Sequence, residues 1–162
     1  MRGSQKVLPG LAAGLCATGA MSALLGLSDT LGVMDRQPPR LIVASLLPLR
    51  PTSRLTNSLA VVAHIGYGTA VGGAFTLLPE PVPHSVRLGT AYGALVYMVG
   101  YEGWLPMLDI LPPAHRDDPR RVATMVASHL VYGASLAYVY HKLTGGGRLA
   151  GSLRAASTVF PG

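Results

Sequence analysis

Residues 55–79 read LTNSLAVVAHIGYGTAVGGAFTLLP, and this stretch contains no Asp, Glu, Lys or Arg. A helix needs about 20 predominantly apolar residues to cross the ~30 Å hydrocarbon core of a bilayer. The stretch therefore predicts a membrane-spanning helix, which we place at residues 58–78.

Three further stretches lack full charges in the same way. They lie between Lys6 and Asp29, between Arg87 and Glu102, and between Arg121 and Lys142. Only 12% of all residues are charged and 49% are apolar, whereas soluble domains carry about 25% charged residues. We therefore predict an all-α, polytopic membrane protein with four transmembrane helices, at residues 7–33, 58–78, 85–111 and 122–143.

The 162 residues suffice for one domain. We predict a four-helix transmembrane domain at residues 1–143, followed by a mobile, basic, Gly- and Ser-rich tail at residues 144–162. The polar linker at residues 35–57 contains an apolar run, 41–49, that is too short to span and predicts a short interfacial segment after the first helix. Pro106 predicts a kink near the end of the third helix.

The second and fourth predicted helices share the pattern H-x-x-Y-G. It reads HIGYG at residues 64–68 and HLVYG at residues 129–133, and it falls at the same depth in both helices. The four helices therefore divide into two related pairs. Because each pair contains two helices, both pairs enter the membrane from the same side, which predicts a parallel 2+2 pseudo-repeat.

Small residues recur four positions apart in the predicted helices. In lipid, helices associate where small residues allow the two backbones to approach closely, so this spacing predicts a tightly packed bundle. The predicted helix-packing residues are Gly10, Gly14, Gly68, Gly72, Gly89, Gly93 and Gly133.

Ionisable side chains inside a span are costly and are therefore functional candidates. The predicted helix bounds place Glu102, His64 and His129 near one level of the bilayer. Tyr67 and Tyr132 each follow a histidine by three residues and share its helical face. We predict that these five residues form a buried polar layer facing the bundle interior, because lipid tails offer a histidine no hydrogen-bond partner.

Three functions of this layer stay open. In the leading interpretation its side chains form interhelical hydrogen bonds, and the protein is of structural or accessory type. The second is transport or proton conduction through Glu102, His64 and His129. The third is a haem or metal site held by the two histidines.

We predict no enzyme activity, no catalytic residue, no metal and no cofactor. Ser128 and His129 are neighbours in sequence, so their side chains point to different faces of a helix. A nucleophilic serine needs a histidine within hydrogen-bond distance. The predicted partners are the lipid bilayer and either a second copy of the chain or a larger membrane complex. Nucleic acid is not expected despite the net charge of +6, because the basic residues lie between apolar blocks and not on one face.

The distribution of basic residues does not decide the orientation in the membrane. The predicted face with both termini carries six of them: Arg2, Lys6, Arg87, Lys142, Arg148 and Arg154. The opposite face carries seven: Arg36, Arg40, Arg50, Arg54, Arg116, Arg120 and Arg121.

Two segments resemble a known group of proteins. Residues 10–22 read GLAAGLCATGAMS, and residues 127–140 read ASHLVYGASLAYVY. They resemble the opening and closing helices of small four-helix bacterial inner-membrane proteins of unknown function, the YagU-like group. The resemblance covers roughly residues 7–143 and implies a four-helix fold and a multi-pass location in the bacterial plasma membrane. It transfers no catalytic residue.

Overall fold

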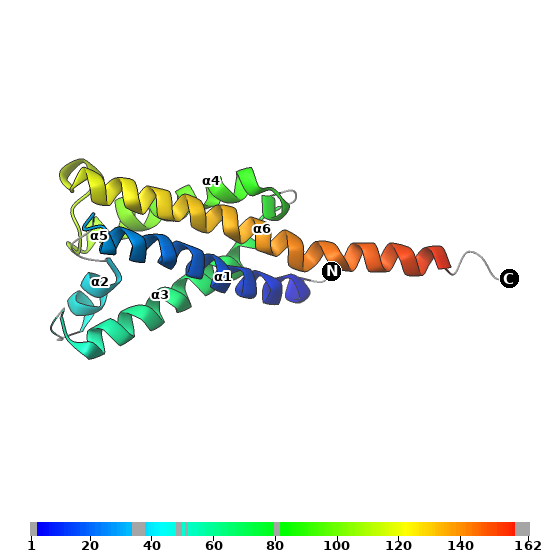
Figure 1. The fold of residues 1–162 in the computed structure, drawn as a ribbon, viewed down its shortest axis with the longest axis horizontal. Helices are drawn as coiled ribbons and strands as arrows, with labels where there is room; N and C mark the ends of the chain where they lie inside the picture. The colour runs from blue at the N-terminus through cyan, green and yellow to red at the C-terminus, as the bar shows by residue number, and fades with distance from the viewer. Residues whose placement is uncertain (1–2, 34–37, 48–49, 51, 80–81, 158–162) are drawn as a thin grey trace.

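The computed structural model describes residues 3–33, 38–47, 50, 52–79 and 82–157, and side chains between residues 6 and 145 of these ranges. The described residues form helices and turns without a strand (Figure 1), which confirms the predicted all-α class. The elements are, in chain order, α1 (Gly3–Thr30), α2 (Pro38–Leu46), α3 (Arg54–Phe75), η1 (Val82–His84), α4 (Val86–Tyr97), η2 (Met98–Trp104), α5 (Leu105–Met107), η3 (Ala114–Arg116) and α6 (Pro119–Ser157).

Three of the described helices are long and apolar enough to cross a membrane. They are Lys6–Thr30 in α1, Arg54–Phe75 in α3 and Pro119–Gly145 in α6. These helices coincide with three of the four predicted spans to within about one helical turn. Ser53 starts α3, because its hydroxyl accepts the backbone N–H of Thr56 at 3.0 Å.

The predicted third helix, residues 85–111, differs from a single kinked α-helix. After α4 the chain forms the π-helix η2, and α5 ends at Met107. The N–H of Leu105 donates to the carbonyl of Gly100, five residues earlier. Glycines at 100 and 103 weaken the α-helix, and Pro106 has no N–H to donate. The α-helical hydrogen bonding of α4 therefore ends at Tyr97, well before the kink predicted at Pro106.

The predicted short segment at 41–49 overlaps the helix α2, which begins three residues earlier, ends at Leu46, lies against α3 and buries Val43. Two prolines open it, and proline suits the first turn of a helix. Linker residues 35–37, 48–49 and 51 lie outside the described residues. At the other end of the chain, α6 continues past the predicted end at Leu143 as far as Ser157, so this part of the tail is helical. The mobility of the tail stays a prediction.

Glycines bring the helices together at two crossings. Where α1 meets α3, a Cβ added to Gly14 would lie 2.7 Å from the carbonyl oxygen of Gly68 and 2.9 Å from Cα of Gly72. Where α4 meets α6, a Cβ added to Gly93 would lie 3.0 Å from the backbone nitrogen of Gly133. The backbones approach this closely because no side chain intervenes. The other two predicted packing glycines lie at the same crossings: Gly10 against α3 and Gly89 against α6.

The two crossings differ in register by one helical turn. Gly14 and Gly93 correspond, because each is the second of two glycines spaced four apart in its helix. Gly14 approaches the carbonyl of Gly68, whereas Gly93 approaches the carbonyl of His129. The H-x-x-Y-G pattern instead aligns Gly68 with Gly133, which lies four residues, or about one turn, after His129. The two histidines of the pattern therefore do not occupy matching positions at the crossings, and the 2+2 pseudo-repeat stays a proposal.

α1 and α6 pack side by side, with α3 against α1 and α4 against α6 (Figure 1). At one end α3 and α4 are in contact. The Tyr92 hydroxyl donates to the Val71 carbonyl at 2.9 Å, and the Phe75 and Tyr92 ring centroids lie 4.9 Å apart. From there α3 runs away from α6 toward α2 (Figure 1). The divergence leaves space between α3 and η2.

Candidate functional site

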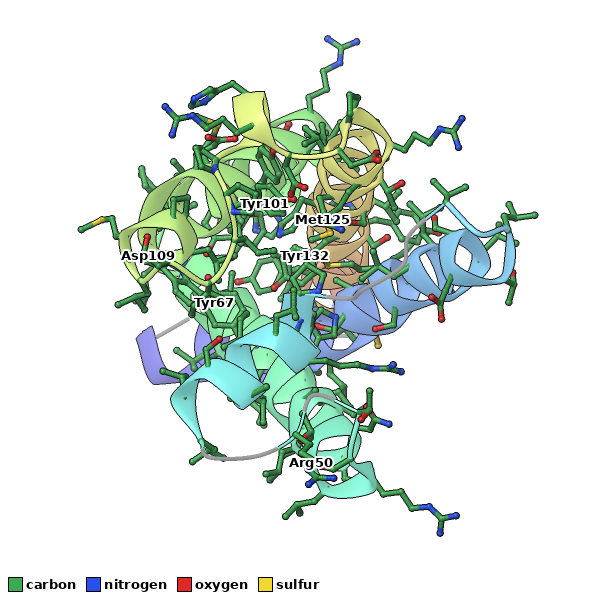
Figure 2. All side chains as sticks on the ribbon, turned by 90° about the vertical axis from the view of Figure 1, so that its left-hand side faces the viewer. Arg50, Tyr67, Tyr101, Asp109, Met125 and Tyr132 are labelled. Carbon is green, nitrogen blue, oxygen red and sulfur yellow. The ribbon has the colours of Figure 1, made fainter. Side chains whose placement is uncertain are left out.

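A cavity of about 240 Å³ lies in this space, lined by residues from α1, α2, α3, α6 and the α4–η2–α5 segment. Figure 2 looks along the bundle from the α2 end and shows Tyr101, Met125 and Tyr132 around the centre, with Tyr67 to one side. Most of the lining is apolar. The cavity nevertheless gathers six aromatic side chains. Four belong to the predicted polar layer, His64, Tyr67, His129 and Tyr132, and the other two are Tyr101 and Trp104.

Tyr132 is the most enclosed of the predicted layer residues. Its side chain is buried, and its hydroxyl donates to the carbonyl of Gly68 at 2.6 Å. Thr18 of α1 lies beside the same glycine and donates its own hydroxyl to Gly14 at 2.7 Å. Tyr132 thus ties α6 to α3 next to the crossing of α3 with α1.

His129 is part-buried and has a defined tautomer. Its Nδ1 lies 2.7 Å from the carbonyl oxygen of Met125. A carbonyl oxygen only accepts hydrogen bonds, so Nδ1 carries the proton, and Nε2 of the neutral ring is an acceptor. The ring also meets Tyr97 edge-on, with centroids 5.5 Å apart. This histidine therefore offers the cavity a lone pair.

His64 is part-buried and differs from His129 in its bonding. Its Nε2 is buried, and no group in the described part of the chain bonds to it. The side chain also lines a second cavity of about 390 Å³ between α1 and α3, where Oδ1 of Asn57 likewise lacks a partner among the described residues. Burying a polar atom without a hydrogen bond costs free energy. His64 thus lines both cavities with other atoms of its side chain, while its Nε2 is covered by protein.

Tyr67 does not lie in a buried layer. Its side chain is 47% exposed, which places it at the rim of the cavity. α3 has α1 on one side and the cavity on the other, so neighbouring helices cover this tyrosine only in part.

Glu102 departs further from the prediction, because it is not among the described residues that line the cavity. Its carboxylate accepts the backbone N–H of Ala114 at 3.1 Å and so holds the loop that follows α5. The wide turns of η2 give its side chains a register different from that of the α-helix that was expected. The three ionisable residues predicted at one level therefore divide into two histidines at the cavity and one carboxylate at the loop.

A second polar cluster was not predicted from the sequence. Asp117 accepts a hydrogen bond from the Tyr101 hydroxyl and pairs with Arg121, with 2.9 Å between Oδ1 and Nη1. Tyr97 stacks on Tyr101 with ring centroids 5.2 Å apart. The four-residue spacing of the two tyrosines is the available signal, because it favours a shared helical face.

No group of three His, Cys, Asp or Glu side chains positioned to hold a metal occurs in the part of the chain that the structure describes. Comparison with protein families, curated proteins and solved structures finds no match to this chain. The resemblance to the YagU-like group therefore stays a prediction. The structure shows a helical fold in the described residues, with three apolar helices of membrane-spanning length.

Proposed function

We propose that this chain is a four-span integral membrane protein of structural or accessory type. The observation that carries the proposal is the hydrogen bond from the Tyr132 hydroxyl to the Gly68 carbonyl, 2.6 Å long and buried. It joins α6 to α3 beside a glycine crossing. A polar group engaged in this way stabilises the bundle.

Other polar groups of the candidate site support the same interpretation. Nδ1 of His129 is bonded within its own helix, the Glu102 carboxylate holds the N–H of Ala114, and Asp117 pairs with Arg121. Each bond fixes a helix or a loop. These groups are therefore engaged in the hydrogen bonding that a stable helical membrane domain requires.

The fourth span is the α4–η2–α5 segment. It carries full charges only at Arg87, in its first turn, and at Glu102, and α4 crosses α6 through glycine as α1 crosses α3. These features support a 2+2 arrangement of four spans with both chain ends on one face, although the two glycine crossings differ in register by one turn. The resemblance of residues 10–22 and 127–140 supports a bacterial plasma membrane as the location.

The competing function is proton conduction, and a vesicle experiment separates the two. The purified chain is placed in liposomes that hold a pH gradient and an internal pH dye. We expect the gradient to decay no faster than in protein-free liposomes, because the Glu102 carboxylate holds the Ala114 amide and does not line the cavity of the two histidines. Faster decay that Glu102→Gln abolishes contradicts the accessory function and supports the conducting one.

The accessory function also predicts association with other protein. We expect crosslinking in the native membrane to trap the chain in a dimer or a larger assembly. A chain that is recovered only as a monomer over a range of crosslinker concentrations contradicts this part of the proposal.

A further inference from the structure

We propose that the cavity between α3 and η2 binds a lipid-soluble compound with one or two aromatic rings and a hydroxyl group on a ring. The inference goes beyond the accessory function, because it assigns a small-molecule site to the bundle.

The cavity opens where lipid would reach it. Two of its lining residues on α3, Ala63 and Tyr67, are exposed. Both lie near the middle of the membrane-spanning helix Arg54–Phe75. An opening at that depth faces hydrocarbon in a bilayer, so the compounds that enter it are those that dissolve in lipid.

The lining favours a flat ring. Tyr67 and Trp104 stand near the opening as exposed and part-buried side chains, and Tyr101 and Tyr132 are buried farther inside. Aromatic side chains pack on another ring in offset or edge-on geometry and gain about 0.5–1.5 kcal/mol beyond the area they bury. Acyl chains make no such contact.

His129 favours a hydroxyl group. Its Nε2 is an acceptor because Nδ1 donates to Met125, whereas Nε2 of His64 is covered by protein. A hydroxyl both donates and accepts, so it can bond to a histidine nitrogen in either protonation state. A carbonyl only accepts and has no donor on His129.

The volume limits the ligand to a small ring system. A cavity of about 150 Å³ already holds benzene, and this one measures about 240 Å³. It therefore accommodates a ring compound of naphthol size, and a longer substituent would leave through the opening between α3 and η2.

The test uses 2-naphthol and its oxygen-free analogue naphthalene, both radiolabelled. Each is added to nanodiscs with and without the full chain, and the excess bound to protein is measured. We expect saturable binding of one 2-naphthol per chain and at least tenfold weaker binding of naphthalene. We also expect 2-naphthol to quench the fluorescence of Trp104, the only tryptophan of the chain, at the same concentrations.

Matched variants locate the site. Ala63→Trp should block the opening and weaken 2-naphthol binding at least tenfold, whereas Ala74→Trp, at an exposed position of the same helix outside the cavity lining, should leave it unchanged. His129→Phe, which removes the acceptor Nε2 and keeps an aromatic ring, should weaken 2-naphthol binding about tenfold and leave naphthalene binding unchanged. Helix content and gel-filtration behaviour confirm that each variant folds.

Three results would overturn the proposal. The first is the absence of saturable binding above empty nanodiscs. The second is equal binding of naphthalene and 2-naphthol, which identifies an apolar cavity filled by lipid chains. The third is loss of binding in Ala74→Trp as well as in Ala63→Trp. Absence of 2-naphthol binding would contradict this inference but not the accessory function. Proton flux in liposomes would contradict the accessory function but not the binding site.

Discussion

Tyr67 and Tyr132 each follow a histidine by three residues, yet they have different surroundings. Tyr132 is 3% exposed and donates to Gly68, whereas Tyr67 is 47% exposed at the cavity rim. α6 packs against α1 and α4, while α3 packs against α1 and the short helix α2. The three-residue spacing predicts that a tyrosine shares the face of its histidine. Which neighbour that face meets depends on the packing of whole helices.

The first prediction concerns the Tyr132 hydroxyl. Tyr132→Phe removes the donor to the Gly68 carbonyl while keeping the ring, so we expect a loss of about 0.6 to 1.7 kcal/mol in the free energy of unfolding. The measurement is reversible unfolding in mixed micelles followed by helix content. Tyr138→Phe, at a position that is 55% exposed, is the control and should change little. A Tyr132→Phe protein as stable as its parent would show that the bond does not hold α6 to α3.

At the scale of helices, the crossing of α1 and α3 supplies the second prediction. Gly14→Ala places a methyl group 2.7 Å from the Gly68 carbonyl oxygen, and overpacking of this kind costs about 1–3 kcal/mol. Gly19→Ala on the same helix is the matched control, since an added Cβ there meets nothing within 4 Å. We expect Gly14→Ala to lower the unfolding free energy in mixed micelles and Gly19→Ala to leave it near the parental value. Equal stability of the two variants would mean that the close approach is absent in the membrane.

The helices that could be predicted from the sequence are those whose cause is local. A full charge is costly anywhere in hydrocarbon, so uncharged stretches give α1, α3 and α6 without knowledge of their neighbours. The π-helix η2 is different, because glycines and a proline weaken an α-helix without specifying which hydrogen-bond pattern replaces it. Sequence spacing assigned Glu102 an α-helical register, so it placed this residue with the histidines.

At the scale of the whole molecule, the proposed fourth span makes a prediction about sidedness. If α4–η2–α5 crosses the bilayer, exposed residues Thr52 and His115 lie on one side and Pro79 on the other. A membrane-impermeant maleimide should therefore label Thr52→Cys and His115→Cys from the same side and Pro79→Cys from the opposite side. Cys16→Ser, which removes the only native cysteine, is the background for all three variants. Labelling of Pro79→Cys and His115→Cys from the same side would reduce the chain to three spans.

The divergence of α3 from α6 gives the bundle unequal ends. In Figure 1 the end that carries α2 and the start of α3 is broader than the end where α3 meets α4. In a bilayer, one leaflet therefore surrounds a larger protein cross-section than the other, and the chain is a wedge. Lipids pack around a wedge with least strain when the membrane curves toward its narrow end. We therefore expect the chain to concentrate in curved regions of the membrane and to bend a flat bilayer where many copies gather.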